Sequence, residues 1–424
     1  MNSSPRVLLV AEHASAKFGG EAALPLHYYR VLRARGVAVW LVVHDRTRIE
    51  LSALYPDDIG SRIQFIPDTW LHRNLWRIGR LLPARIANFS VGFLMRLSSQ
   101  ILQRKVVKRL VIEQNISVIH QPMPVSPKEP SLIFNMGAPV IIGPMNGGMD
   151  YPPSFRGLQG TSERISLWMG RRFANIINRI IPGKRKAALL LVANKRTKMA
   201  LPECVQNIPV EMVVENGVDM ALWANRSDAP KRIGDHAHFI YMGRLVDWKA
   251  VDILVSAFAM ACKYAKITLS IIGDGVERKA LEELAVKLYA LGREGEEGHV
   301  CFKGWLSQAD CASQLRKADV LVLPSLMECG GAVVLEAMAM SMPVIATKWG
   351  GPIDYLDESC GILVEPSSRQ EMVDDIANAM IELANSPDRR QKMGVAARTR
   401  VETFFDWELK ADKIMKLYQQ VGKS

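Results

Sequence analysis

The second half of the chain alternates short apolar runs with stretches of helical periodicity. From residue 237 onward the apolar runs read HFIYM, ITLSII, HVCFKGW, VLVLPS, MPVIATKW and GILVEP, and helical stretches separate most of them. Strands that are apolar throughout and separated by helices are typical of a parallel sheet that is covered on both faces. This pattern predicts a doubly wound α/β domain over residues 237–400.

The first half repeats the pattern less regularly. Its apolar runs read RVLLVAE, VAVWLVVH, RIQFIP, SVIHQP, APVIIGP and ALLLVAN, which predicts a second α/β sheet domain over residues 1–220. Residues 221–236 between the halves lose apolar periodicity and gain Asn, Asp, Pro and Gly, as a linker does. Because open α/β sheets bind ligands beyond the carboxyl ends of their strands, we expect two facing domains with the ligand in the cleft between them.

Composition agrees with a two-domain globular protein. With 424 residues, 49% hydrophobic and 23% charged, the chain is long enough for two cores. Its six cysteines form no CxxC pair and no Cys/His cluster with metal spacing, which indicates reduced thiols and a cytoplasmic location. The N-terminal apolar run soon reaches His13, as a first strand does and a signal peptide does not. No uncharged apolar run approaches the roughly 20 residues that span a bilayer.

The net charge of +11 is concentrated in two segments of the first half. Residues 69–112 contain nine Lys/Arg and no Asp/Glu, and residues 163–200 contain ten Lys/Arg and one Glu. In NLWRIGRLLPARI and LWMGRRFANIINRII, apolar residues recur at helical spacing with Arg between them, as in an interfacial helix. We therefore expect an anionic membrane surface as a partner, the alternative being that these apolar faces pack within the domain. No nucleic acid partner is expected, because the interleaved aromatics and glycines of a single-strand platform are missing.

The segment VLVLPSLMECGGAVVLEAMAMSMPVIATKWGG reads as strand, tight loop, helix and strand. Gly330 and Gly331 open the predicted helix, which leaves its backbone N–H groups and positive dipole end accessible to an anion such as a diphosphate. Small residues at this point, Ala332 included, let a phosphate approach. Glu336 on the second turn could accept hydrogen bonds from two ribose hydroxyls, and Glu328 before the glycines would face a sugar.

The alternative is that Glu336 is a solvated helix residue and that the glycine pair only makes a tight turn. However, Glu336 lies in AVVLEAMAM, whose other residues are all apolar. An unpaired carboxylate is costly in such surroundings unless it binds something. The sequence therefore favours a donor-binding site over a simple turn.

The spacing E-x7-E of Glu328 and Glu336, followed by a PVIAT strand and a glycine pair, closely resembles the donor-site signature of retaining glycosyltransferases of family 4. The resemblance extends over GRLVDWKAVDILVSAFA, IIGDGVERKALEEL, FKGWLSQADCASQLRKADVLVLPS and ETFFDWELKADKIMKLY. It implies the GT-B fold: an acceptor-binding N-terminal Rossmann-like domain, a C-terminal Rossmann-like domain that binds the nucleotide sugar, and a C-terminal helix at residues 401–424 that packs back on the N-terminal domain.

The resemblance also implies roles for residues of two glycine-containing segments. Arg244 and Lys249 in GRLVDWK would clamp the donor diphosphate. Arginine offers a bidentate fork and lysine a point charge, and both would stabilise the departing diphosphate; the alternative is an ordinary surface pair. Gly19 and Gly20 match the family's glycine loop near the donor phosphate, whereas a lone GG is more often a turn. The absence of GxGxxG argues against a dinucleotide oxidoreductase.

Two residues of the first half also have counterparts in the family. His120 in SVIHQP matches the first histidine of an HxH-like strand end, which implies contact with the sugar. Pro122 stands where the second histidine often lies, and a core histidine is the alternative. Asn146 in GPMNGG interrupts a glycine-rich acceptor-side loop, which implies contact with sugar or acceptor.

The implied reaction moves a sugar from a nucleoside-diphosphate sugar to a hydroxyl of a glycan or lipid-linked acceptor, with retention at the anomeric carbon, in polysaccharide or cell-envelope glycan biosynthesis. Glu328, His120, Arg244 and Lys249 are the expected catalytic residues. No Asp-x-Asp occurs, so neither a metal nor another cofactor is expected. The alternatives are a nucleotide-sugar 2-epimerase or phosphorylase of the same fold, or a non-catalytic nucleotide-sugar-binding protein.

Overall fold

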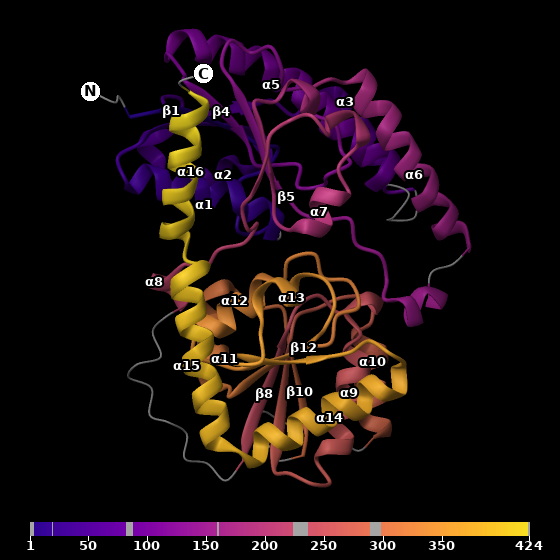
Figure 1. Ribbon diagram of the computed structural model, residues 1–424. Helices are drawn as coiled ribbons and strands as arrows, with labels where there is room; N and C mark the ends of the chain where they lie inside the picture. The colour runs from indigo at the N-terminus through magenta and orange to yellow at the C-terminus, as the bar shows by residue number, and fades with distance from the viewer. Residues whose placement is uncertain are drawn as a thin grey trace. The chain divides into compact units, whose positions relative to one another are not determined.

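The computed structural model describes residues 4–18, 20–81, 88–158, 161–223, 236–288 and 298–422, without the side chains of residues 88, 89, 161–169 and 171. The chain divides into two compact units (Figure 1). The first consists of Met1–Gly148, Arg164–Glu215 and Glu408–Ser424, and the second of Met149–Glu163 and Asn216–Trp407. Each unit is built around its own parallel sheet, which confirms the predicted two-domain α/β fold.

The sheet of the first unit has the strand order β3-β2-β1-β4-β5-β6-β7. Its strands are β1 (Arg6–Val10), β2 (Ala38–His44), β3 (Ile63–Ile66), β4 (Val118–Gln121), β5 (Val140–Met145), β6 (Leu189–Val192) and β7 (Val210–Met212). All neighbouring strands pair in parallel. The central strands are buried along nearly their whole length because helices cover both faces, which explains their uninterrupted apolar runs.

Helices of the first unit cover this sheet. They are α1 (Gly20–Ala34), α2 (Arg48–Leu54), α3 (Trp70–Gly79), the π-helical turn η3 (Asn88–Gly92), α5 (Phe93–Glu113), α6 (Thr161–Ile180, mostly in this unit), α7 (Lys195–Met199) and α16 (Trp407–Val421). The core between β-strands and α5 is apolar, with Val107 and Leu110 of α5 packed against Leu8 and Ile119. Each such fully buried side chain contributes roughly 1.5–3 kcal/mol.

The sheet of the second unit has the order β10-β9-β8-β11-β12-β13. Its strands are β8 (Ala237–Met242), β9 (Ile267–Ile272), β10 (Val300–Gly304), β11 (Val320–Leu323), β12 (Val344–Thr347) and β13 (Gly361–Val364). The order reverses between β8 and β11, which are neighbours in space although two strands separate them in sequence. In open α/β sheets, ligands bind at such a switch point, beyond the carboxyl ends of the strands.

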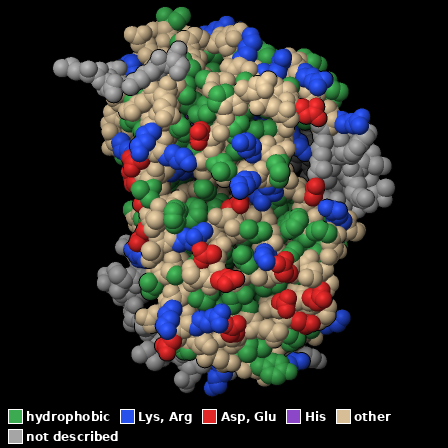
Figure 2. All heavy atoms as spheres, in the orientation of Figure 1, with side chains coloured by type: hydrophobic (Ala, Val, Ile, Leu, Met, Phe, Trp, Pro, Cys, Tyr) green, Lys and Arg blue, Asp and Glu red, His purple; other side chains and the backbone are tan. Residues whose placement is uncertain are grey.

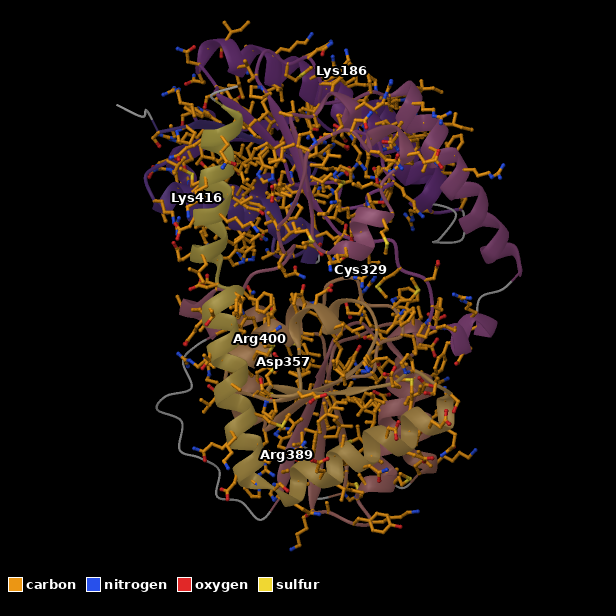
Figure 3. All side chains as sticks on the ribbon, in the orientation of Figure 1. Lys186, Cys329, Asp357, Arg389, Arg400 and Lys416 are labelled. Atoms are coloured by element: carbon orange, nitrogen blue, oxygen red, sulfur yellow. The ribbon has the colours of Figure 1, made fainter. Side chains whose placement is uncertain are left out.

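The helices of the second unit are α8 (Met220–Trp223), α9 (Val251–Ala261), α10 (Arg278–Lys287), α11 (Gln308–Lys317), α12 (Ala332–Ala339), α13 (Gly351–Tyr355), α14 (Arg369–Asn385) and α15 (Pro387–Phe404). Helices α9 to α13 connect these strands in turn, α8 precedes the first strand, and α14 and α15 follow the last. Arg400 of α15 fixes the segment before β13 through Asp357, at 2.7 Å, as Figure 3 illustrates. Residues 224–235 of the predicted linker lie outside the described residues. None of the helices that the structure describes is long and apolar enough to cross a membrane.

The C-terminal helix α16 belongs to the first unit, far in sequence from the rest of that unit. Its buried residues Ala411, Ile414 and Tyr418 recur at helical spacing and form one apolar stripe. On its other side, Arg35 of the first unit forms an ion pair with Asp412 at 2.6 Å. These contacts tie the end of the chain to the first sheet.

Tyr418 provides a test of how α16 is held. Its hydroxyl lies 2.6 Å from Nδ1 of His120, and Nε2 of His120 lies 2.5 Å from the Gly143 carbonyl oxygen. A carbonyl can only accept, so Nε2 carries the proton and Nδ1 accepts from the tyrosine.

We expect Tyr418→Phe to lower the free energy of unfolding of the first unit by about 1–3 kcal/mol, because it leaves a buried nitrogen without a partner. Denaturant unfolding measures this change. Tyr264→Phe is the matched control, because Tyr264 is exposed in the second unit and should change stability by less than about 0.5 kcal/mol. Equal stability of the wild type and Tyr418→Phe would contradict this account.

Candidate donor site at the switch point of the second sheet

The predicted donor residues of the second unit converge at its switch point. Arg244 and Lys249 follow β8, and Glu328 lies in the loop after β11. Because β8 and β11 are neighbouring parallel strands, their carboxyl ends open onto the same edge of the sheet. The topology therefore brings together residues that are about 80 positions apart in sequence.

An ion pair connects the two strand ends. The ammonium group of Lys249 contacts Oε2 of Glu328, and both side chains are mostly buried, with 13% and 14% of their surface exposed. The Ser325 hydroxyl lies 3.4 Å from the same carboxylate oxygen. A pair held in such partly dry surroundings is stronger than an exposed one, so it fixes the Lys249 side chain at the edge of the sheet.

Backbone hydrogen bonds fix the same two segments. The amides of Leu326 and Met327 both donate to the Trp248 carbonyl oxygen, at 2.9 and 3.3 Å. The short turn Asp247–Lys249 ends at Ala250, which has a left-handed backbone with φ of 50°. The loop after β11 is therefore held in place by the backbone of GRLVDWK, and Lys249 and Glu328 meet as a consequence.

Glycines permit a close backbone approach around Glu328. The Gly351 amide donates to the Glu328 carbonyl oxygen at 2.7 Å. A Cβ atom on Gly351 would lie only 2.0 Å from the Gly330 carbonyl oxygen, and one on Gly350 would lie 2.3 Å from that of Glu328. No side chain fits in such contacts, so the glycine pair after β12 is a packing requirement.

The N-terminus of α12 is open to an anion. Its N-cap Gly331 has φ of 81° and, within the described residues, no side chain caps the first turn, which begins at Ala332. The first backbone N–H groups of a helix have no partner within the helix and carry partial positive charge. Together with the Lys249 ammonium group, they give this loop the chemistry of a phosphate site.

Glu336 lies one turn further along α12 and is half-buried. Among the residues that the structure describes, no hydrogen-bond donor or cation pairs with its carboxylate. Burial raises the pKa of Glu336 to about 7. Burial, with a contribution from the Glu336 charge, also raises the pKa of the nearby Cys311 thiol to about 11. A carboxylate in this position is available to a ligand that can donate hydrogen bonds.

Arg244 presents an exposed side chain beside this loop. Its guanidinium carbon lies 5.8 Å from the centre of the Trp248 ring, a cation–π distance, and its carbonyl oxygen accepts from the Tyr241 hydroxyl at 3.0 Å. The backbone of Arg244 is therefore fixed while its guanidinium group remains accessible. Cys329, labelled in Figure 3, is exposed in the loop between β11 and α12.

The structure places the predicted first-half residues in other surroundings. His120 is completely buried and bonded through both ring nitrogens, and burial lowers its pKa to about 4. Asn146 is also buried, with its amide nitrogen 2.5 Å from a carboxylate oxygen of Glu215. Gly20 begins α1 with open space where a Cβ would lie. Gly19 lies outside the described residues.

Sequence reasoning did not single out Ser325, Trp248, Gly350 or Gly351 as site residues. Ser325 is fully buried next to Glu328, and its only sequence signal is a polar residue directly after a buried strand. The glycine pair Gly350 and Gly351 was part of the recognised motif, but its packing role depends on a backbone contact with the preceding loop.

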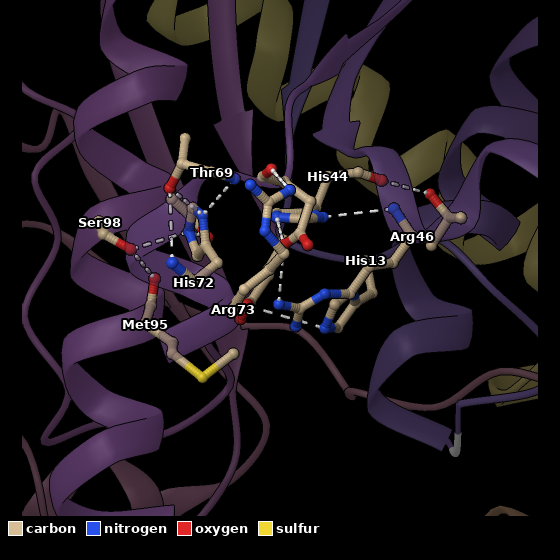
Figure 4. A network of polar contacts seen from close by, with 12 residues as sticks. His13, His44, Arg46, Thr69, His72, Arg73, Met95 and Ser98 are labelled. Atoms are coloured by element: carbon tan, nitrogen blue, oxygen red, sulfur yellow. Dashed lines mark hydrogen bonds and ion pairs between the residues drawn. The ribbon is translucent and has the colours of Figure 1, made fainter. Parts of the chain in front are cut away.

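A group of three side chains in the first unit has ligand atoms within 4.8 Å of one another: His44, Asp68 and His72. Both ring nitrogens of His72 are engaged, with Nδ1 2.8 Å from the Thr69 hydroxyl and Nε2 2.8 Å from the Ser98 hydroxyl (Figure 4). Arg46 lies 3.3 Å from the Asp68 carboxylate. Among the described residues, Nε2 of His44 has no hydrogen-bond partner, whereas both nitrogens of His72 and the Asp68 carboxylate are engaged. Because Arg46 also repels a cation, the cluster fits a hydrogen-bonded network better than a metal site.

Comparison with known proteins supports this description of the second unit. Residues 225–400 match the family of glycosyl transferases group 1. An uncharacterized glycosyltransferase of Methanocaldococcus jannaschii is 30% identical over 55% of this chain and 60% of its own length. A GDP-mannose-dependent monoacylated alpha-(1-6)-phosphatidylinositol monomannoside mannosyltransferase of Corynebacterium glutamicum is 31% identical over 42% of this chain and 45% of its own. The chain therefore spans about half the length of these curated relatives.

A solved structure covers the whole fold. HepE of Anabaena in complex with UDP has a TM-score of 0.64 over 98% of this chain and 100% of its own, at 18% identity. At this identity the likeness concerns the fold. Residues 225–400 thus form a glycosyl transferases group 1 domain, in a chain that has the GT-B fold and glycosyltransferase homologues.

Proposed function

We propose that this protein is a retaining glycosyltransferase of family 4 that moves a sugar from a nucleoside-diphosphate sugar to a hydroxyl of a glycan or lipid-linked acceptor. The observation that carries the proposal is the convergence of Lys249, Glu328 and the open N-terminus of α12 at one switch point, with the unpaired Glu336 one turn away. A cationic loop next to a carboxylate that lacks a partner matches a diphosphate joined to a ribose.

In this proposal the diphosphate lies against the first turn of α12, at Gly330, Gly331 and Ala332, and receives charge from Lys249 and Arg244. Glu336 accepts hydrogen bonds from the ribose hydroxyls. Glu328 orients Lys249 in the free protein and faces the sugar when the donor is bound. Its negative charge then lies where positive charge develops at the anomeric carbon.

The reaction breaks the bond between the anomeric carbon and the diphosphate oxygen, and the electron pair leaves with the nucleoside diphosphate. The acceptor hydroxyl oxygen forms the new bond on the same face of the sugar and its proton passes to the departing diphosphate oxygen, so the product keeps the donor's anomeric configuration. Positioning and charge stabilisation by Lys249 and Arg244 account for most of the catalysis. We propose no metal and no further cofactor, because side chains and helix amides provide the positive charge that a metal ion would otherwise provide at the diphosphate.

We assign His120 a positioning role in the first unit rather than a catalytic one, because both of its ring nitrogens are bonded inside that unit. Asn146 likewise supports its loop through Glu215. The first unit is proposed to bind the acceptor and the second to bind the donor. Gly20, with open space beside it, remains a candidate for contact with the donor phosphate.

Two features of the relatives support candidate substrates. HepE is described in complex with UDP, and the C. glutamicum relative is named for GDP-mannose and a phosphatidylinositol mannoside. We therefore propose UDP- and GDP-sugars as the first donors to test, and a lipid-linked acceptor in polysaccharide or cell-envelope biosynthesis.

In this proposal the protein acts in the cytoplasm and is peripheral at the inner face of the cell membrane, on an anionic lipid surface. An epimerase, a phosphorylase or a non-catalytic binding protein is less favoured, since these relatives are named as transferases.

The roles of Glu328 and Glu336 should separate in steady-state kinetics with the best donor. Glu336→Ala should mainly raise the donor KM, because ribose binding is similar in the ground and transition states. Glu328→Gln should lower kcat by roughly 10²-fold with a smaller change in donor affinity, because its charge acts more strongly in the transition state.

Glu283→Gln is the matched control for these variants, since Glu283 is a well-exposed glutamate on α10 whose side chain is 68% exposed. Circular dichroism checks that each variant is folded. If both site variants keep wild-type turnover and donor affinity, the proposed donor site is wrong.

Glu336 also predicts a pH dependence of donor binding. Its carboxyl has a pKa of about 7 in the free protein. Ribose hydroxyls donate to the ionised form, so binding below this pH must first release a proton. We expect the affinity for nucleoside diphosphate to fall by up to about tenfold per pH unit below pH 7, and to level off above it.

Fluorescence titration between pH 5.5 and 8.5 measures this dependence, with Glu336→Gln expected to bind weakly and to lack the step. The raised pKa has a second consequence that needs no ligand. The stability that Glu336 contributes in its protonated form is present at low pH and is lost as pH rises through about 7, and Glu336→Gln should remove that loss. A wild type whose donor affinity is constant over this range would contradict the ribose contact.

A further inference from the structure

Helix α3 of the first unit presents large apolar side chains to solvent. Trp70, Trp76 and Ile78 of α3 are 70%, 53% and 50% exposed, and Leu81, two residues beyond the end of the helix, is 85% exposed. Singly scattered apolar residues are ordinary on a protein surface, but several on one short helix indicate an interaction surface.

Polar contacts on the inner face of α3 hold the helix on the first unit. His72 is completely buried, and its nitrogens bond to the Thr69 hydroxyl and to the hydroxyls of Ser98 and Ser99 on α5. Figure 4 shows the contacts of His72 with Thr69 and Ser98. The Thr69 hydroxyl and the His72 ring also form a capping box at the start of the helix. Polar bonds thus anchor α3 to the unit, while its tryptophans point away.

Basic residues accompany the exposed tryptophans. Arg73, Arg77 and Arg80 are exposed on α3 or directly after it, and the guanidinium carbon of Arg80 lies 5.0 Å from the Trp76 ring centre. Residues 69–112 contain no Asp or Glu, so no carboxylate of this segment offsets these charges. Arg85 of the same basic segment lies outside the described residues.

Helix α6 adds a second surface of the same kind. Phe173, Ile176 and Ile180 recur at helical spacing and are 58%, 55% and 73% exposed. Arg172 and Arg179 are exposed next to them. The side chains of residues 161–169 and 171 of α6 are not among the described ones, and the exposed face is defined by residues 172–180.

The two helices are joined through the start of α5. On one side, His72 of α3 bonds to Ser98 and Ser99 of α5. On the other, Arg96 of α5 forms an ion pair with Glu129. Asn178 of α6 donates to the carbonyl oxygen of the adjacent residue, Lys128, at 2.8 Å. Figure 1 shows α3, α5 and α6 in the same part of the first unit. On the face drawn in Figure 2, Lys and Arg side chains are prominent over this unit.

We propose that the exposed faces of α3 and α6 form a docking surface for an anionic lipid bilayer, defined by Trp70, Trp76, Ile78, Leu81, Arg73, Arg77, Arg80, Phe173, Ile176, Ile180, Arg172 and Arg179. This identifies the part of the fold that would carry the membrane contact, and it does not require the proposed transferase activity. Charge complementarity selects the occupant, since the surface combines arginines with aromatic and aliphatic side chains. Tryptophan and arginine side chains together suit the boundary between headgroups and acyl chains, where rings bury and guanidinium groups reach lipid phosphates.

The test uses the full chain and vesicles without any substrate. Co-sedimentation is measured with vesicles of phosphatidylcholine alone and of phosphatidylcholine mixed with an equal share of phosphatidylglycerol, at about 0.01 M and about 1 M salt, where the Debye length is roughly 30 and 3 Å. We expect strong binding to the mixed vesicles at low salt, and weak binding to neutral vesicles or at high salt.

Two variants locate the surface. Arg73→Gln/Arg77→Gln/Arg80→Gln should weaken partitioning into anionic vesicles by about 100-fold, from roughly fivefold per arginine near an anionic surface. Trp70→Ser/Trp76→Ser should weaken it by roughly tenfold and abolish the quenching of tryptophan fluorescence by brominated lipid that docking of α3 produces.

Matched controls come from the second unit. Lys263→Gln/Lys266→Gln/Lys392→Gln removes the same charge from exposed positions, and Tyr264→Ser removes an aromatic residue that is 69% exposed. Both should bind vesicles as the wild type does. A melting temperature close to that of the wild type checks that the α3 variants are folded.

Binding that is equal for neutral and anionic vesicles, or that the α3 variants leave unchanged, would overturn the proposal. So would α3 variants that change the oligomeric state in solution without changing vesicle binding, because the face would then cover a second copy of the chain. Since nucleotide binding is absent from this assay, failure here leaves the proposed donor site untouched, and failure of the donor site leaves this surface untouched.

Discussion

The ion pair of Lys249 and Glu328 is the contact on which the proposed donor site depends. It joins the carboxyl ends of β8 and β11, the two strands between which the order of the second sheet reverses. Next to it, Gly350 and Gly351 after β12 allow backbone groups to approach so closely that any side chain would collide. The site therefore depends on the topology of the sheet and on glycines at close backbone contacts. Its charged groups are placed by a backbone that has little freedom to move.

Glu336, unlike Glu328, has no cation beside its carboxylate among the described residues. A half-buried carboxylate without a partner among the described residues costs stability, and the same burial raises its pKa to about 7. A carboxylate kept in this state is ready for a ligand that supplies hydrogen bonds, and binding energy then offsets the cost of burial.

Much of the fold could be predicted from the sequence because it depends on local patterns. Uninterrupted apolar runs predicted parallel strands buried on both faces, and the glycine pair before AVVLEAMAM predicted an open helix N-terminus. A core position was one of the two alternatives for His120, but its partner Tyr418 could not be predicted, since it lies 298 residues away in sequence. The same holds for Asn146, which bonds to Glu215, and for Ser325, whose neighbour Glu328 is drawn toward Lys249 by the packing of two distant loops. Long-range partners of this kind leave no periodic signal in one sequence.

The central claim is that the switch point of the second sheet binds a nucleoside diphosphate. Amide hydrogen exchange tests it most directly, measured with and without a saturating amount of whichever of UDP, GDP and ADP binds most tightly. The account predicts slower exchange concentrated in residues 243–250 and 326–336, the two segments that the ion pair joins. Ligand-induced protection that is absent from both segments, or confined to the first unit, would contradict it.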